Sequence, residues 1–456
     1  MKKTILNVLM LSSLVLTAAC KRDFLDIKQN ISQAVPRNIS DFQAILDNSG
    51  EMNAASSHGL GMLGGDEYFI QDGRLSNIKD AYQRNGYIWA REIHEGESCP
   101  DWNNAYSRIL LSNLSLEGIE KIKPVASQQA AWNNVKGCSL FFRAINFYQL
   151  AQEFCNPYDP ATKDQDMGIP LRLESDISLK ISRGTVGGTY QRIILDLKEA
   201  ADLLPEKPLI KNRPSRLAAL AMQAKTYLLM GDYQSAAQYA DQCLQINNYL
   251  IDLKTLKDLN QSYPLTEINI EENNELIFLL TTTNITLIAV ARFNAAADLL
   301  NSYEANDLRK QAWFYDSSGR VLFGGGYLSG KCTGLAVNEV ILIRAECRAR
   351  TGNLAGALED LNYLLRNRYN SSFIPLAIAD QDALLKRILE ERKKELVMRG
   401  TRWEDLRRLN KEGRFAKMLT RTIDGNNYQL PPNDPRYVYP IPEQEILMSG
   451  IRQNLR

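Results

Sequence analysis

The spacing of apolar residues predicts a chain built mainly of helices. In residues 340–365, apolar side chains recur at helical intervals on both sides of a Thr351-Gly352-Asn353 break. After the break, positions 354, 357, 358, 361 and 365 are all Leu or Ala, close to the ideal i, i+3, i+4, i+7 series. Gly352 suits the left-handed residue that ends a helix, and Asn353 suits the cap that begins the next. This stretch therefore predicts a helical hairpin.

A second copy of this pattern surrounds Gly231-Asp232-Tyr233. When the two copies are aligned on their glycines, small or apolar residues match in three pairs, Ala224/Ala345, Ala236/Ala357 and Leu244/Leu365. Small residues at a hairpin crossing let two helices approach closely, as in the 34-residue tetratricopeptide repeat. The copies lie far apart in the chain, so we expect a superhelix of scattered hairpins instead of a tandem array.

The remaining chain alternates between helical pairs and long polar segments. Helical pairs are predicted near residues 102–154, 188–245, 337–368 and 381–410. Between them lie segments rich in Gly, Asn, Asp and Tyr, at residues 49–99, 156–187, 250–334 and 411–441. Segments of this length in a compact domain are usually functional or separately folded. Within one of them, residues 275–283 have the composition of a strand.

The N-terminus resembles a lipoprotein signal. Lys2 and Lys3 precede an apolar run over residues 5–16, and small residues then lead to Cys20. The run is too short for a permanent membrane span and suits a secretory signal core. We expect residues 1–19 to be the signal peptide and Cys20 to carry the lipid. The alternative is an ordinary signal peptide cut nearby, with Cys20 incidental.

The composition of the chain argues against several classes of function. The chain has 54 basic and 53 acidic residues, and this balance argues against a nucleic-acid partner. It has only two histidines and no Cys-x-x-Cys pair, so we expect no zinc site of the usual His/Cys type. We also expect no other metal and no cofactor. Cys138, Cys243 and Cys347 lie in apolar helical patterns and are expected in the core.

An ordered series of short motifs resembles the SusD/RagB family, the starch-utilisation-system D-like proteins. The motifs are Phe24-Leu25-Asp26, Gly168-Ile169-Pro170, Arg183-Gly184-Thr185, Glu339 to Glu346, Arg402-Trp403, Asp405-Leu406 and Tyr439-Pro440-Ile441-Pro442. The chain departs from the family's pattern at Arg399, Thr401 and Glu404. The resemblance implies that residues 20–456 form one SusD-like domain of tetratricopeptide-like hairpins with long irregular insertions and a few short strands.

The same resemblance implies a function without chemical conversion. Family members are lipid-anchored outer-membrane proteins, facing the cell surface, that capture oligosaccharides and pass them to a SusC-like TonB-dependent transporter. Two alternatives stay open: a peptide-capturing member of the family, and a helical-repeat scaffold lipoprotein of outer-membrane assembly. An exported glycan-cleaving enzyme would need a carboxylate pair across a cleft, and the sequence singles out none.

Ligand contacts are expected in two clusters of aromatic and polar residues. The first cluster is Asp66, Tyr68, Asp72, Arg74 and Trp89; the second is Trp313, Tyr315 and Tyr327, beside the run Gly324-Gly325-Gly326. Flat rings can cover the apolar side of a sugar, and the polar groups can bind its hydroxyls. The alternative is that these aromatics, Trp89 and Trp313 above all, pack the irregular segments.

The C-terminal motifs are interpreted as structural. Trp403 is expected to be buried, and the charges of Arg402 and Asp405 are expected to be paired, so that the last helix locks against the repeats. Glu390, Glu391 and Glu395 have the spacing of a solvated, salt-bridged helix face, with Glu390 placed to pair with Lys394. This interpretation is favoured over a catalytic one.

Overall fold

The computed structural model describes residues 35–283, 293–328 and 332–456. The predicted signal peptide and Cys20 lie outside these ranges. Within them, no helix combines the length and apolar character that crossing a membrane requires.

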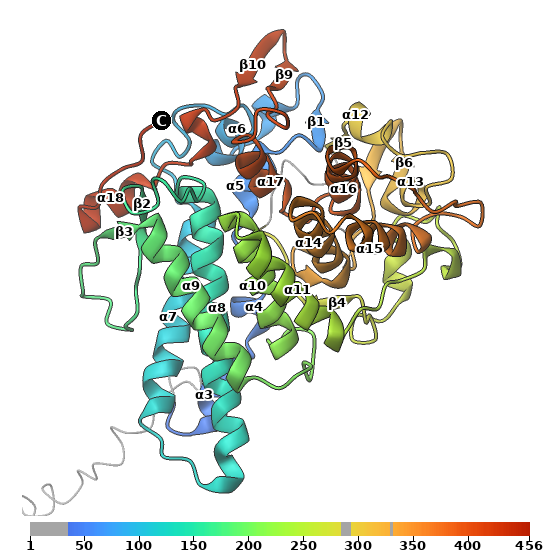
Figure 1. Cartoon of the computed structure of the whole chain (residues 1–456). Coiled ribbons are helices and arrows are strands. Elements are labelled where there is room, and N and C mark those ends of the chain that lie inside the picture. The colour runs from blue at the N-terminus through green and yellow to red at the C-terminus, as the bar shows by residue number, and fades with distance from the viewer. Residues whose placement is uncertain (1–34, 284–292, 329–331) are drawn as a thin grey trace, which may run out of the picture.

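Ten helices of the described chain have eight or more residues, and the nine other than α3 (Ile39–Leu46) form the scaffold. They are α7 (Pro100–Glu120), α8 (Gln129–Phe154), α9 (Val186–Leu203), α10 (Arg216–Met230), α11 (Tyr233–Ile246), α14 (Val337–Arg350), α15 (Leu354–Arg366), α16 (Gln381–Glu395) and α17 (Arg402–Leu409). Each of α7 to α11 packs against the next, α11 packs against α14, and α14 packs against α15 and α16. Figure 1 shows this series running from α7 on one side to α15 on the other. The prediction of a mainly helical, tetratricopeptide-like superhelix is confirmed.

The two hairpins turn as their sequences predict. Gly231 and Gly352 have φ values of +75° and +87°, the left-handed region that favours glycine. Asp232 Oδ1 accepts from Ser235 N at 3.0 Å, and Asn353 Oδ1 accepts from the N–H of Gly356 at 3.0 Å, so each second helix begins with a side-chain cap. The matched alanines at 224, 236, 345 and 357 are fully buried, which allows the helices to cross closely.

The strands are short and pair only two at a time in the described residues. All five pairs are antiparallel: β1 (Tyr68–Ile70) with β5 (Phe293–Ala295), β2 (Met167–Pro170) with β3 (Arg183–Thr185), β4 (Leu276–Phe278) with β8 (Leu335–Ala336), β6 (Phe314–Ser317) with β7 (Arg320–Phe323), and β9 (Leu419–Ile423) with β10 (Asn426–Leu430). The strand predicted at residues 275–283 is thus present as the shorter β4. Its pairing with β8 leads directly into α14.

Short helices complete the irregular segments. They are α4 (Ser49–Met52), α5 (Gly59–Gly64), α6 (Ala81–Tyr87), α12 (Ala297–Leu300), α13 (Arg309–Trp313) and α18 (Glu443–Ser449). In Figure 1, α6 and β9–β10 lie at the top, α18 lies at the left, and α12 and α13 lie at the right.

The C-terminal motif locks α17 against the core, as predicted. Trp403 is buried, with its ring 4.8 Å from that of Tyr437 and 5.4 Å from that of Tyr439. A Cβ on Gly64 would lie 2.5 Å from the Trp403 ring, so only glycine lets α5 approach this closely. Asp405 pairs with Arg392 at 2.8 Å and with Arg408 at 2.9 Å.

The prediction that three glutamates of α16 lie on a solvated face is wrong for two of them. Glu391 and Glu395 are buried and bind Arg309, which is also buried and pairs with Asp307 at 2.6 Å. Lys394 pairs with Glu391 at 2.7 Å and not with the exposed Glu390. The physical reason is the long insertion before α14, which folds back over α16 and carries Arg309 onto the helix.

All six cysteines of the described chain are buried free thiols. Cys138, Cys243 and Cys347 have no exposed surface, so their predicted place in the core is confirmed.

Candidate ligand-binding face

Short strands bring the two predicted ligand clusters to one side of the molecule. The first cluster contains β1, which pairs with β5 through Tyr68 opposite Ala295 and Ile70 opposite Phe293. β5 also lies against β7, whose partner β6 carries Tyr315 of the second cluster. We call the surface over β1, β5, β6 and β7 the strand face; it lies beside α12 and α13 in Figure 1. The two clusters are therefore neighbours, although one follows α5 and the other precedes α14.

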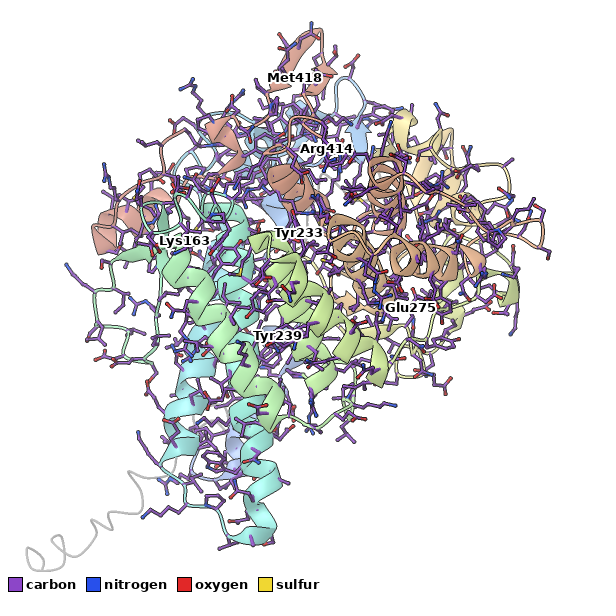
Figure 2. The ribbon with its side chains drawn as sticks, viewed as in Figure 1. Lys163, Tyr233, Tyr239, Glu275, Arg414 and Met418 are labelled. Carbon is purple, nitrogen blue, oxygen red and sulfur yellow. The ribbon has the colours of Figure 1, made fainter. Side chains whose placement is uncertain are left out.

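Asp66 is held in an ion-pair network at the edge of this face. Its carboxylate accepts from Arg402 at 2.5 and 3.0 Å and from Lys417 at 2.7 Å. Burial opposes its ionisation, but Arg402 and then Lys393 and Lys417 hold the pKa of Asp66 well below its usual range. Met418, next to Lys417, lies on the upper surface before β9 (Figure 2) and is partly exposed. Asp66 thus joins the C-terminal motif to the strand face as a permanent anion.

Tyr68 and Trp89 are buried around an arginine that belongs to the protein itself. The Arg421 guanidinium carbon lies 3.8 Å from the ring centroid of Tyr87, 4.3 Å from that of Trp89 and 5.8 Å from that of Tyr68. The same group donates to the carbonyls of Leu63, Gly65 and Tyr87.

This arginine changes the interpretation of the first cluster. The Trp89 indole N–H donates to the carbonyl of Gly64 at 3.0 Å, which fixes the ring in the core. Ring faces covered by a cation are not open to a sugar. In this structure Trp89 therefore packs the irregular segments, which was the alternative to a ligand contact. The periodic pattern gave no sign of Arg421, because it lies on β9, far along the chain.

Asp72 and Arg74 lie on an exposed loop that is tied to the β9–β10 turn. Asp72 Oδ1 accepts from the N–H of Asp424 at 2.7 Å, and Asp424 Oδ1 accepts from that of Gly73 at 2.5 Å. These reciprocal bonds fix the loop's position. The side chain of Phe69, on β1 before this loop, is 45% exposed. The loop therefore offers an aromatic ring beside polar groups.

The glycine run beside the second cluster serves packing. A Cβ on Gly325 would lie 2.7 Å from the ring of Trp313, and one on Gly324 would lie 1.9 Å from the carbonyl oxygen of Ser262. Trp313 is buried under this run. Tyr327 is also buried and donates at 2.6 Å to Glu275, which directly precedes β4 and is labelled in Figure 2.

Tyr315 is the second-cluster residue with an accessible ring. It is half-buried on β6, and its ring centroid lies 5.7 Å from that of Tyr263 in an edge-on arrangement. The two hydroxyls are 3.3 Å apart. Burial, and then the hydroxyl of Tyr263, raise the pKa of Tyr315 to about 12, so the Tyr315 phenol is a neutral hydrogen-bonding group at neutral pH. Tyr263 was not predicted; it comes to Tyr315 because Gly324 lets the Ser262 loop approach β7.

Beside Asp66, one buried carboxyl is poised to titrate near neutrality. Burial raises the pKa of Glu67 to about 7. The N–H of Met398 donates to this carboxyl at 3.1 Å and lowers the pKa, but by less than burial raises it. The Glu67 side chain is buried, so it offers no contact to a ligand on the strand face. In the described ranges, no three His, Cys, Asp or Glu side chains form a group suited to a metal ion.

Comparisons with known proteins agree at the level of sequence and of fold. The family model described as "Starch-binding associating with outer membrane" matches residues 23–228, and the model described as "SusD family" matches residues 337–455. A curated relative, SusD-like protein P2 of Formosa agariphila, is 26% identical over 418 residues, which cover 76% of this chain and 78% of the relative.

Solved structures share the fold. A SusD superfamily protein from Bacteroides thetaiotaomicron VPI-5482 superposes with a TM-score of 0.73 at 20% identity, over 92% of this chain and 100% of the other. The surface glycan-binding protein A from Bacteroides fluxus gives a TM-score of 0.72 at 18% identity, over 92% and 99% of the two chains.

Proposed function

The chain belongs to the SusD/RagB family, and from this we propose that it captures oligosaccharides at the outer membrane and passes them unaltered to a TonB-dependent transporter. The observation that carries the proposal is the match of two models of this family, in order, to the N-terminal and C-terminal parts of one superhelical fold. The first model's description names starch and the outer membrane, and the Bacteroides fluxus protein of the same fold is named for glycan binding.

The anchor and the partner complete the proposal. Cys20 would carry the lipid that holds the protein on the membrane, facing the cell surface. A SusC-like transporter would lie beneath it and receive the cargo. The long helices offer a rigid scaffold for such a contact, while the irregular segments are free to vary with the ligand.

We place the ligand on the strand face, around its accessible groups. Tyr315 and Tyr263 offer an aromatic edge, and Phe69 offers a second ring across β5. Asp72 and Arg74 supply hydroxyl partners on a fixed loop. Asp66, Tyr68, Trp89, Trp313 and Tyr327 support this surface from below, so their contribution is to shape the face.

The experiment compares removal of the ring at the half-buried Tyr315 and at the exposed Tyr249. Tyr315→Ala should weaken binding of an oligosaccharide that the wild-type protein binds by about tenfold or more, as expected for loss of a stacking ring. Tyr249→Ala is the matched control, because Tyr249 is 47% exposed but follows α11, away from the strand face. Equal affinities of wild type and Tyr315→Ala for the oligosaccharide would show that the ligand does not bind on the strand face.

Two other outcomes would redirect the function. Saturable binding of peptides, with no affinity for glycans, would identify a peptide-capturing member of the family. Co-purification with outer-membrane proteins, with no affinity for either ligand class, would indicate an assembly scaffold.

A further inference from the structure

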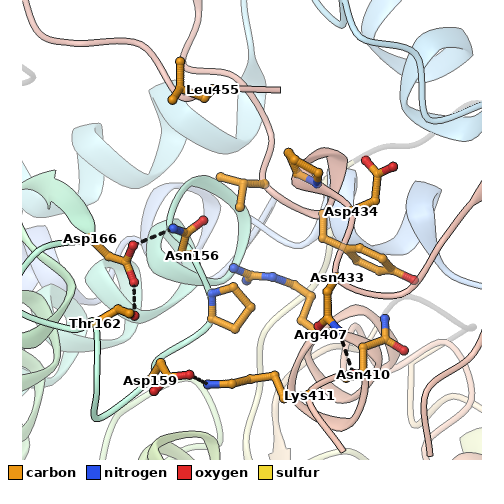
Figure 3. A pocket seen from close by; sticks show the side chains of 14 residues that line it. Asn156, Asp159, Thr162, Asp166, Arg407, Asn410, Lys411, Asn433, Asp434 and Leu455 are labelled. Carbon is orange, nitrogen blue, oxygen red and sulfur yellow. Dashed lines mark hydrogen bonds and ion pairs between the residues drawn. The ribbon is translucent and has the colours of Figure 1, made fainter. Parts of the chain in front are cut away.

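A groove lies between the end of α8, the end of α17 and the C-terminal segment. Two adjoining cavities of about 470 and 240 Å³ share Asn156, Asp166, Val438 and Leu455 as lining residues, and together we call them the C-terminal groove. Figure 3 shows the larger cavity, with Leu455 at its edge. The groove lies near β2 and α18, on the opposite side of Figure 1 from β5 and β6 of the strand face. Its volume falls in the range of small-molecule sites.

Rigidly held carboxylates line one wall of this groove. Asp166 accepts from Asn156 at 2.8 Å and from the hydroxyl of Thr162 at 2.5 Å (Figure 3). Asp159 pairs with Lys411 at 2.7 Å across the entrance. Each carboxylate has lone pairs beyond these bonds, so both can accept from a ligand hydroxyl without rearranging.

The opposite wall contains two buried donors with unmet hydrogen bonds. The terminal nitrogens of Arg407 donate to the carbonyls of Gln152 and Cys155, which end α8, but Arg407 Nε has no partner in the described ranges. Asn410 Oδ1 accepts from Lys417 N at 3.0 Å, while Asn410 Nδ2 is also without a partner there. Both residues are more than nine-tenths buried and line the groove. An unmet buried donor costs about 1–3 kcal/mol, so a ligand oxygen gains this free energy where a small side-chain movement opens these buried atoms to the groove.

Charge balance indicates which kind of ligand suits the groove. Lys411 neutralises Asp159, and Arg436 neutralises Asp434 at 2.9 Å. Arg407 and Asp166 then remain, one of each sign, so the walls of the larger cavity carry no net charge; the smaller cavity adds only the exposed Arg452. A free anion or cation would meet as much repulsion as attraction. Apolar contacts come from Pro157, Pro435, Val438 and Leu455.

We propose that the C-terminal groove is a second binding site, for one neutral polyhydroxylated ring such as a single sugar residue. Hydroxyls of the ring would donate to Asp166 and Asp159 and would accept from Arg407 and Asn410. The CH face of the ring would lie on the prolines and Val438. This site is separate from the strand face, and it stands whether or not the strand face binds oligosaccharides.

The test uses D-glucose, D-galactose and D-mannose with the protein from residue 21 onward. Saturation-transfer NMR detects weak binding, and a titration gives the affinity. Leu455→Trp fills the groove without burying a new charge, since Leu455 is 81% exposed. The control is Leu447→Trp, since Leu447 is 84% exposed on α18 and does not line the groove.

The expected result is saturable binding of at least one of these sugars that Leu455→Trp weakens by about tenfold or more, as loss of most contacts in a small site requires. Asp166→Asn should weaken it too, while Leu447→Trp and Tyr315→Ala should leave it unchanged. Absence of binding by the wild type, or binding that Leu455→Trp does not alter, would overturn the groove proposal. Binding lost only in Tyr315→Ala would assign the sugar to the strand face instead.

Discussion

Replacing Arg421 with methionine should loosen the strand face without disturbing the helical scaffold. Methionine keeps the apolar stem of the side chain but removes the guanidinium that binds the carbonyls of Leu63, Gly65 and Tyr87. Each buried carbonyl that loses its donor costs about 1–3 kcal/mol, and water can recover part of this. The lost contacts with three rings add about 1–2 kcal/mol.

An opposing effect lowers this total. Arg421 is buried and has no carboxylate partner among the described residues, so removing the charge also removes its desolvation cost. We expect a net loss of about 3–5 kcal/mol in the free energy of unfolding. For a chain of this size, about 1 kcal/mol corresponds to roughly 1 °C in Tm, so Tm should fall by about 3–5 °C.

Calorimetric melting measures the fall, and hydrogen exchange locates it. Amides of residues 65–74 should exchange faster in Arg421→Met, while those of α8 and α14 should stay protected. The control is Arg366→Met, since Arg366 is exposed on α15. A Tm equal to that of the control, with unchanged exchange over residues 65–74, would refute the idea that Arg421 organises this face.

Three further predictions concern buried groups and one close approach. Burial raises the pKa of Glu67 to about 7 from 4.5, so wild type should lose stability as pH rises through this interval. Near pH 4, Glu67→Gln should have the same Tm as wild type. Near pH 8 it should have a higher Tm, with a free energy of unfolding greater by up to about 3 kcal/mol. A difference in Tm between variant and wild type that is the same at both pH values would contradict this. Arg309→Met should cost about 3–5 kcal/mol in denaturant unfolding, because three buried carboxylates lose the cation that they share and keep only their outer partners Lys394, Arg387 and Arg368; a loss no larger than that of Arg366→Met would count against it. Gly324→Ala should lower both Tm and oligosaccharide affinity, because its Cβ would lie 1.9 Å from Ser262 O, whereas Gly413→Ala, which meets nothing within 4 Å, should change neither; normal binding by Gly324→Ala would contradict it.

Local patterns were sufficient to predict the scaffold. The helical pair predicted near residues 102–154 is present as Pro100–Glu120 and Gln129–Phe154, because an unbroken apolar pattern defines a helix wherever it packs. The cap predicted at Asn353 is present, and Asp232 caps the helix at the same position of the second copy, since a cap depends on residues three positions away. The C-terminal lock around Trp403 followed from the family resemblance.

The candidate site depended on contacts that spacing does not encode. A tyrosine on an irregular segment has the same appearance in sequence whether its ring faces solvent, as Tyr315 partly does, or a resident arginine, as Tyr68 does. The α16 glutamates have the spacing of an exposed face, and only the fold of the preceding insertion brings Arg309 onto them. Segments distant in sequence therefore decided which predicted residues are accessible.

The most direct test of the central claim is calorimetry of the protein from residue 21 onward against a panel of oligosaccharides and peptides, with the ligand recovered and analysed afterwards. Capture predicts saturable binding of at least one oligosaccharide and its recovery intact. Recovery of a cleaved oligosaccharide, or no binding to any oligosaccharide in the panel, would contradict it.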